Sequence, residues 1–407
     1  MSNLCRAAAL LFLLFGNAGT AQVLTSEDSL QAGLIQKEKA TVISGYGEVK
    51  VSYDTQLETA NASVTRAVIF IGHRFNKSIA LFSELELEDA QISGDGVGGE
   101  LSLEQLFLKF NLNRDHYISA GLFLPRIGII NENHLPNTYH GNFRPFTEQL
   151  VIPATWREIG VGINGPIQAI TGLNYSAAVL NGLNSSAFVN GEGIRDGRYS
   201  GKNATYTNLA FTGSLLYYTG DFRFQVSGYY GGSAGLSQRE ADSLQLDNSA
   251  FGTPVGLVEA NATYNGKIFS ATALAAYVSL NDAYEINRAY ANNTPEAITG
   301  GYLEGAVDIL KIFEPETTRS LSYFARCEMM NLNQKIADNG IVNDANEKFY
   351  FVTGLEYKPL KGVVIKCDYV FRKTGEQNSE LILNPFPQAP PYYTENGFVN
   401  IGLGYSF

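Results

Sequence analysis

Residues 398–407 read FVNIGLGYSF, and apolar residues alternate along this stretch with small or polar ones. Side chains of an extended strand point to opposite faces with a period of two. One face therefore carries Val399, Ile401, Leu403, Tyr405 and Phe407, and the other carries Asn400, Gly402, Gly404 and Ser406. Chain ends usually fray in water. This pattern instead predicts a last strand that is paired on both edges and packed against an apolar environment.

The composition is poor in charge and rich in aromatic residues. Of 407 residues, 45% are apolar and only 17% are charged, with 41 Gly and 23 Tyr, whereas average soluble domains carry roughly 25% charged residues. The mean hydropathy of -0.07 is nevertheless close to neutral. A soluble two-domain enzyme and a structure that alternates apolar with polar residues both fit that value, so periodicity has to distinguish them.

The N-terminal segment reads as an export signal. Residues 1–21, MSNLCRAAALLFLLFGNAGTA, contain Arg6, an apolar run and small residues near Ala21, which predicts a secretory signal peptide cleaved after Ala21. Residues 22–40 form a polar leader that we expect in the periplasm. Past the signal there is no run of about 18 uncharged apolar residues, so no transmembrane helix is predicted.

From residue 41 onward nearly every segment alternates like a strand, as in DFRFQVSGYY (221–230). Short turn-forming links near residues 75, 112, 164, 219, 265, 313 and 358 take turns with longer polar links. The longer links are 54–62, 89–100, 126–154, 181–203, 234–250, 281–299, 332–346 and 375–396. Seven tight turns and eight long loops require about sixteen strands, and this sorting of loops by length is typical of outer-membrane barrels.

The fold class predicted for residues 41–407 is therefore all-β, a transmembrane antiparallel barrel with short periplasmic turns and long external loops. In a bilayer every backbone N–H and C=O needs a partner, so the last strand must pair with the first. Its apolar face should then contact outer-membrane lipid. Tyr405 and Phe407 are the expected signal for the barrel-assembly machinery.

Five stretches share a likeness with one known group of proteins. They are AGLFLPRIG (120–128), ENHLPNTYHGNFRPFTEQLVIPATWREIGVGINGP (132–166), IRDGRYSGKN (194–203), GLEYKPLKGVVIKCDYVFRK (354–373) and NIGLGYSF (400–407). These stretches resemble the phosphate-selective porin O and P family. The resemblance covers Ser44 to Phe407 and implies a sixteen-stranded barrel, usually a homotrimer, that passes small solutes, with its third long loop folded into the pore. It also marks Arg195 and Arg198 as part of an Arg-bearing fourth loop.

The third strand departs from an anion-selective pattern. In SIALFSELELEDA (78–90), Glu84, Glu86 and Glu88 share the face opposite the leucines. With those leucines toward lipid, three carboxylates stand in a row in the lumen. The chain also has 40 acidic residues against 29 basic ones. Both features favour cations over phosphate.

The third long loop and its neighbours supply the remaining candidate pore-lining residues. Mixed charges there predict a constriction, because rings of charged side chains select ions in pores. The alternative is a network of ion pairs that holds the loop against the wall, and the two do not exclude each other. The candidates are Arg126, Glu132, Arg144, Glu148, Arg157, Glu158, Arg195 and Arg198.

Other function classes receive little support from the sequence. Only four histidines are present, and no Ser is placed convincingly beside one of them, so we expect no enzyme. His134 and His140 with Glu132 could ligate a metal, but loop spacing alone is a weak signal; no metal or cofactor is predicted. No basic run points to nucleic acid.

The sequence thus predicts a bacterial outer-membrane porin for passive diffusion of small hydrophilic solutes or ions, general or weakly cation-selective. The alternatives are a substrate-specific anion channel of the phosphate type and an outer-membrane adhesin or receptor that binds through its long loops.

Overall fold

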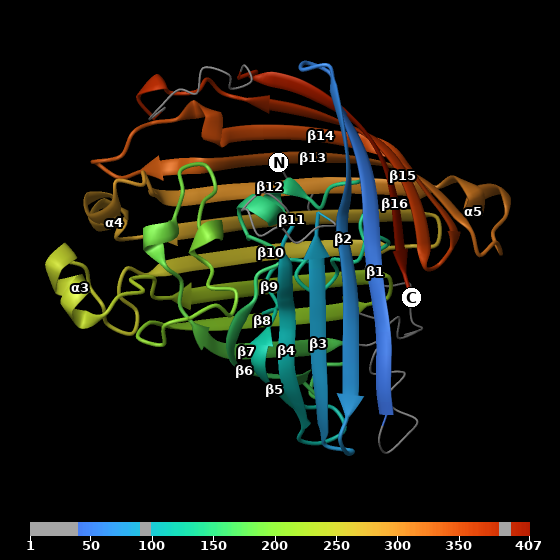
Figure 1. Ribbon diagram of the computed structural model, residues 1–407. Coiled ribbons are helices and arrows are strands. Elements are labelled where there is room, and N and C mark those ends of the chain that lie inside the picture. Colours follow the sequence, from blue (N-terminus) through green and yellow to red (C-terminus); the bar gives the residue numbers. More distant parts are fainter. Residues whose placement is uncertain (1–39, 90–98, 382–391) are drawn as a thin grey trace, which may run out of the picture.

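A computed structural model describes residues 40–89, 99–381 and 392–407. These residues form sixteen strands that close into one antiparallel barrel (Figure 1), as the sequence predicts. The strands are β1 (Ala40–Asp54), β2 (Thr59–Arg74), β3 (Ile79–Glu88), β4 (Leu101–Asn111), β5 (Tyr117–Phe123), β6 (Glu158–Pro166), β7 (Leu173–Asn181), β8 (Leu209–Thr219), β9 (Phe222–Gly231), β10 (Val255–Asn265), β11 (Phe269–Leu280), β12 (Pro295–Asp308), β13 (Ser320–Ile336), β14 (Glu347–Leu360), β15 (Val363–Thr374) and β16 (Glu395–Ser406).

The first and last strands close the barrel. β16 pairs with β15 on one side and with β1 on the other, where Leu403 lies opposite Val49. Every strand pairs with its two neighbours, so the closed sheet has no free edge. A sheet without an edge satisfies the backbone in a medium that offers no hydrogen bonds.

The two faces of the sheet differ as the alternation predicts. The outward face carries large exposed apolar side chains, which suit contact with lipid. Among them are Val49, Val51, Ile69, Ile71, Val161, Val179, Leu215, Val226, Leu303, Ile365, Ile401 and Leu403. The inward face mixes charged, amide and aromatic side chains, many of them fully buried. The third long loop, which packs against these inward side chains, accounts for much of that burial.

The third loop (residues 124–157, between β5 and β6) folds into the barrel and fills much of it, as expected. It contains the short helix α2 (Phe146–Leu150). The inward side chains of many strands pack in one apolar cluster with its Ile127, Val151, Ile152 and Trp156. The third loop therefore acts as a core for the barrel.

Two links differ from the predicted lengths. The β1–β2 link, expected to be a long loop over 54–62, is only residues 55–58, because the register of this hairpin runs to Asp54 opposite Thr59. The β12–β13 link, expected as a tight turn near 313, is longer and holds α5 (Ile309–Phe313), whose first turn is capped by Asp308. The length of a polar segment in the sequence does not show whether it is a loop or the polar end of a strand.

The other helices lie in the external loops. α3 (Gln238–Leu244) and α4 (Ala283–Tyr290) lie at one end of the barrel, opposite the end that carries α5 (Figure 1). Short 3₁₀ turns are η1 (Ser185–Ala187), η2 (Arg195–Gly197), η3 (Asp344–Asn346) and η4 (Ser379–Leu381). The described residues contain no helix with the length and apolarity needed to cross a membrane. The predicted signal peptide (1–21) and all of the leader but residue 40 lie outside the described residues.

Candidate pore interior

The third loop crosses the barrel and is fastened to the strands on the far side. Asn137 Nδ2 donates to Ser406 Oγ and to the Lys361 carbonyl, both at 3.0 Å. Lys366 Nζ donates to the carbonyls of Tyr139 and Gly141 at 2.8 Å. The loop therefore reaches from β5 and β6 to β15 and β16.

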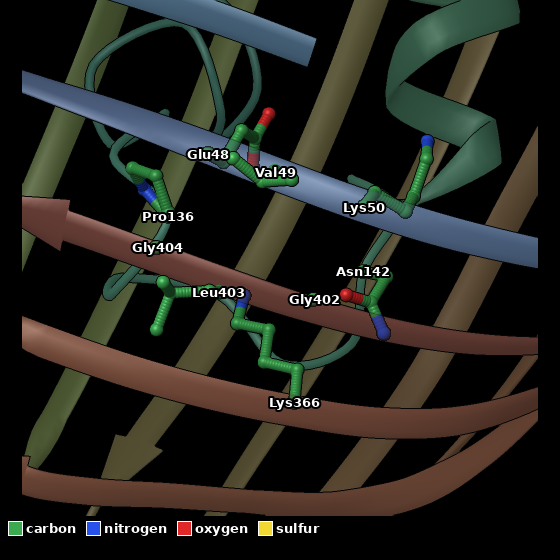
Figure 2. Close-up of a pocket in the computed structure, with 9 residues that line it drawn as sticks. All are labelled: Glu48, Val49, Lys50, Pro136, Asn142, Lys366, Gly402, Leu403 and Gly404. Atoms are coloured by element: carbon green, nitrogen blue, oxygen red, sulfur yellow. The ribbon is translucent and has the colours of Figure 1, made fainter. Parts of the chain in front are cut away.

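The small residues on the inward face of β16 have a packing reason. A side chain at Gly402 would collide with Asn142, and one at Gly404 would collide with Pro136. Glycine avoids both contacts, because the third loop lies directly on these positions. Figure 2 shows the pocket at this contact, lined by residues of β1, β15, β16 and the third loop: Glu48, Val49, Lys50, Pro136, Asn142, Lys366, Gly402, Leu403 and Gly404.

The three glutamates of β3 are placed differently from one another. Glu84 is fully buried, where it accepts from Gln105 Nε2 at 2.7 Å and lies 3.3 Å from His134 Nε2. Glu86 is also buried and forms an ion pair with Arg66 at 3.2 Å. Glu88 is half-buried. Glu84 and Glu86 thus face the interior but are covered and partnered.

Arg126 and Glu132 pair with each other at the start of the third loop. The distance from Arg126 Nε to Glu132 Oε1 is 2.6 Å, and both side chains are partly buried. Burial alone would lower the pKa of Arg126, but the Glu132 carboxylate holds that pKa above its usual range. The ion pair links two loop residues that are six positions apart in the sequence.

Glu148 of α2 organises the same part of the loop from inside. Its Oε2 accepts from the backbone N–H groups of Ile129 and Ile130, both at 2.7 Å, and its Oε1 accepts from the Tyr302 hydroxyl at 2.8 Å. Burial raises the pKa of Glu148 to about 7. Gly128 has φ of +71°, and a Cβ there would lie 2.7 Å from Glu148 Oε2, so only glycine fits beside this carboxyl.

Arg144 and Arg157 extend the contacts of the third loop. Arg144 is buried, and its Nη2 donates to the His134 carbonyl at 3.3 Å. Arg157 Nη1 lies 3.4 Å from Oε1 of Glu104 on β4. Arg144 therefore links two parts of the third loop, whereas Arg157 links the end of that loop to β4 of the barrel wall.

The fourth loop is tied to the end of the third. Glu158 accepts from Asn181 Nδ2 at 2.7 Å and from the Tyr199 backbone at 3.1 Å. Arg198 Nη1 donates to the Pro153 carbonyl at 2.6 Å, and burial together with the nearby Arg195 lowers the pKa of Arg198 to about 10. Arg195 is half-buried in the turn η2.

Most of the candidate charges are thus brought together around the third loop, where they make contacts that hold it. Two of those contacts, Arg126 with Glu132 and Arg157 with Glu104, are ion pairs, and the others are hydrogen bonds to backbone or neutral side-chain groups.

Sequence reasoning missed several charged residues of the interior. Arg326 on β13 is fully buried, pairs with Glu328 and Glu304 at 2.9 Å each, and donates to the Phe143 carbonyl of the third loop at 3.1 Å. Strict alternation would have located it, as it would Lys366 and Asp368. Glu104 was hidden by a bulge: Gln105 pairs with Glu84 but Leu103 pairs with Leu85. The two successive polar residues in LSLEQLFL mark that break in alternation.

No model of a known protein family matches the chain. An uncharacterised protein of Aquifex aeolicus (strain VF5) is 27% identical over 348 residues, which cover 82% of this chain and 76% of that protein. This relative assigns no activity.

Solved outer-membrane proteins share the fold. The outer membrane channel DcaP of Acinetobacter baumannii aligns with a TM-score of 0.55 at 12% identity over 91% of this chain and 98% of its own. An anion-selective porin from Comamonas acidovorans aligns with a TM-score of 0.53 at 11% identity over 91% and 100%. Salmonella typhi OmpF in complex with daunomycin gives 0.55 at 12% over 91% and 98%. At such low identity the likeness concerns the fold, and the chain has the fold of sixteen-stranded outer-membrane porins.

Proposed function

We propose that this protein is a porin of the bacterial outer membrane through which small hydrophilic solutes or ions diffuse passively. The observation that carries the proposal is a closed barrel that is apolar outside, with a long loop folded into an interior of charged, amide and apolar side chains. That arrangement separates a lipid-facing wall from a charged interior. No residue constellation for catalysis enters the proposal.

The proposal also covers how the protein is exported, inserted and assembled. Residues 1–21 direct export and are removed, 22–40 form a periplasmic leader, and 41–407 insert as the barrel with the aid of the barrel-assembly machinery. A homotrimer is proposed because OmpT of Vibrio cholerae, whose barrel aligns with a TM-score of 0.52, has been solved in a trimer form. Outer-membrane lipid is the other partner; nucleic acid is not one.

Weak cation selectivity is the finer proposal. It is supported by the excess of acidic over basic residues and by Glu84, Glu86 and Glu88 on the inward face of β3. A phosphate-type anion channel is the second candidate, and a different observation favours it. Lys50, Lys348 and Arg372 face the interior half-buried, and within the described residues none of them forms a salt bridge with a carboxylate.

Planar-bilayer recordings on the purified, folded protein test both proposals. Discrete conductance steps support the porin, and the sign of the reversal potential in a KCl gradient separates cation from anion preference. Competition by phosphate at low concentration, with a reversal potential on the anion side, would replace the first candidate by the second. Absence of any conductance from verified trimers or monomers would overturn the porin proposal and leave an outer-membrane adhesin as the remaining hypothesis.

A further inference from the structure

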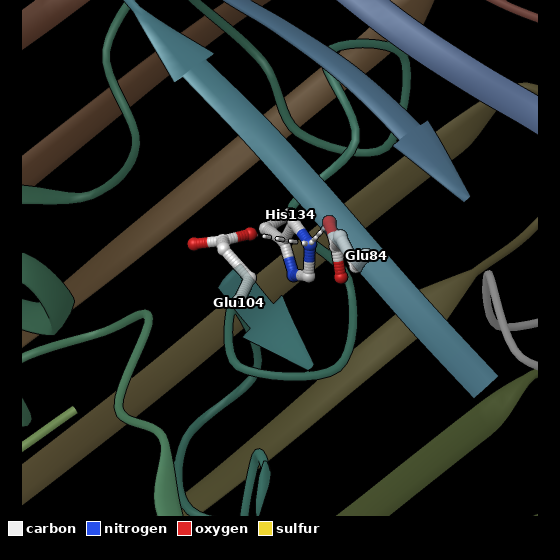
Figure 3. A group of neighbouring side chains, drawn as sticks. All are labelled: Glu84, Glu104 and His134. Carbon is white, nitrogen blue, oxygen red and sulfur yellow. Dashed lines mark hydrogen bonds and ion pairs between the residues drawn. The ribbon is translucent and has the colours of Figure 1, made fainter. Parts of the chain in front are cut away.

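We propose that Glu84, Glu104 and His134 form a binding site for one divalent transition-metal ion, of which Zn²⁺ is the representative. The three residues come from β3, from β4 and from the third loop, and Figure 3 shows their side chains converging. His134 Nε2 lies 3.3 Å from Glu84 Oε1 and 3.9 Å from Glu104 Oε2. One ligand atom from each lies within 4.8 Å of the other two. The ion would fasten the third loop to the barrel wall.

The unused valence of Glu104 is the second observation that points to a ligand. Glu104 is 1% exposed, and in the part of the chain that the structure describes no donor group is bonded to its Oε2, although the carboxyl of Glu86 lies within hydrogen-bond reach of the Glu104 side chain. A buried carboxylate oxygen without a partner is costly, because it has lost its water and gained nothing in return. This orphan oxygen is the atom that faces His134.

The other oxygen of each glutamate is held by a neighbour. Glu104 Oε1 accepts from Thr155 Oγ1 at 2.9 Å and from Arg157 Nη1 at 3.4 Å. Glu84 Oε2 accepts from Gln105 Nε2 at 2.7 Å. Metal ligands are characteristically oriented by outer hydrogen bonds of this kind, which leave one atom of each side chain free for the metal.

A hydrogen bond of its other ring nitrogen orients His134 as well. Its Nδ1 lies 3.3 Å from the Asn131 carbonyl, which can only accept, so the proton belongs on Nδ1. In the neutral ring Nε2 then presents a lone pair to two carboxylate oxygens, and that contact is repulsive. A proton shared among these three side chains, or a cation between them, removes that repulsion.

Geometry and charge favour the metal. Zn²⁺ binds nitrogen and carboxylate oxygen at roughly 2.0–2.2 Å, which separates neighbouring tetrahedral ligands by roughly 3.4 Å. The distances of 3.3 Å and 3.9 Å from His134 Nε2 to the two carboxylate oxygens bracket that separation. Two carboxylates and a neutral imidazole balance a divalent ion, and a water can take the fourth position. The bulge in β4 turns Glu104 and Gln105 inward together, and such bulges re-aim side chains at functional sites.

The test uses the full-length protein, folded in detergent, without any affinity tag and stripped with EDTA. Zn²⁺ is titrated against a fluorescent chelator, and the metal retained after desalting is counted by mass spectrometry. We expect one Zn²⁺ per chain, with an absorption-edge spectrum that contains one imidazole nitrogen. Glu104→Gln and His134→Gln should each weaken binding by at least about tenfold, since even outer-sphere changes have effects of that size.

His140→Gln is the matched control. His140 lies in the same loop and also next to a buried carboxylate, Glu356, at 3.4 Å, but outside the cluster. It should bind Zn²⁺ like the wild type. Each variant is first checked for folding by its heat-dependent mobility on a gel. Wild-type protein that retains no Zn²⁺ at micromolar concentration would overturn the proposal. Equal affinity of the wild type and Glu104→Gln would show an adventitious ion only.

Discussion

Gly45 and Phe407 exchange two backbone hydrogen bonds, from Gly45 N to the Phe407 carbonyl at 3.1 Å and from Phe407 N to the Gly45 carbonyl at 2.9 Å. The last residue of the chain is therefore part of the seam between β1 and β16. Its ring lies beside Gly45, where a Cβ would come within 3.3 Å of the ring atoms. The Phe407 side chain remains 73% exposed on the outside of the barrel. The pairing of Gly45 with Phe407 therefore closes the barrel and also places the terminal aromatic ring on its outer face.

Replacing Phe407 with Asp should lower the amount of folded protein in the outer membrane. The aromatic ring suits the interface between lipid and water, whereas a carboxylate there opposes insertion. We expect a several-fold drop, measured by immunoblot of heat-resistant barrel in membrane fractions. Phe407→Tyr keeps the aromatic and should assemble normally, and Phe313→Asp places the same charge on the α5 link. Wild-type levels of Phe407→Asp would mean that the terminal aromatic has no part in assembly.

The folded barrel should resist detergent until it is boiled. A closed sheet exposes no edge from which unfolding can start, and the third loop adds a packed interior. Unheated and boiled samples should therefore migrate differently on a denaturing gel, and circular dichroism should show mostly β-structure. Identical migration combined with a helical spectrum would contradict the fold.

The charges on β3 are expected to bias the flow of ions. Changing Glu84, Glu86 and Glu88 together to Gln removes negative charge from the inward face, so the reversal potential should shift toward anions. The shift should shrink at high salt, because the screening length falls from about 10 Å at 0.1 M to about 3 Å at 1 M. Recordings are made after EDTA treatment, since Glu84 also belongs to the proposed metal site.

Glu316→Gln supplies the control for that experiment. This residue is exposed in the β12–β13 link, so the variant loses one acidic charge away from β3. It should keep the wild-type reversal potential. If the triple variant also keeps it, the buried Glu84 and Glu86 contribute no field along the ion path, and Lys50, Lys348 and Arg372 become the residues to change.

The barrel was predictable because a lipid-facing wall forces a simple rule on the sequence. Val399, Ile401 and Leu403 alternate with Asn400 and Gly402, and most other strands likewise alternate exposed apolar side chains with inward ones. The β1–β2 link was misjudged because residues 59–62 (TANA) lack apolar alternation, although the strand pairing continues to Asp54 opposite Thr59.

The interior was less predictable because its contacts are long-range. Nothing local to His134 indicates Glu84, which lies fifty residues earlier, or Glu104 behind its bulge. The sequence grouped His134 with His140 and Glu132 by spacing along the loop, whereas the structure places His134 against the wall and His140 beside Glu356. Loop spacing carries no such information, since the path of the loop is set by the strands it touches.

The contact between Glu148 and the third loop should depend on pH. Burial raises the pKa of Glu148 from 4.5 to about 7, so the packed loop favours the protonated carboxyl. Its stabilising effect is complete below pH 4.5, declines as the released form ionises, and is lost above pH 7. A shift of this size corresponds to roughly 3 kcal/mol. Hydrogen exchange of residues 126–134, corrected for the intrinsic rates, should therefore become faster between pH 5 and pH 8.

Glu148→Gln isolates that carboxyl from the other titrating groups of the interior. Its amide oxygen can accept from Ile129 and Ile130 and its amide nitrogen can donate to Tyr302, so the contacts survive without a charge. Protection of residues 126–134 should then vary much less with pH than in the wild type, while exchange in α3, an external helix remote from this carboxyl, should match in both proteins. Equal pH dependence in the wild type and the variant would exclude Glu148 as the group that titrates. Faster exchange toward low pH in the wild type would contradict the direction of the shift, because a buried acid that is neutral when packed cannot release the loop by gaining its proton.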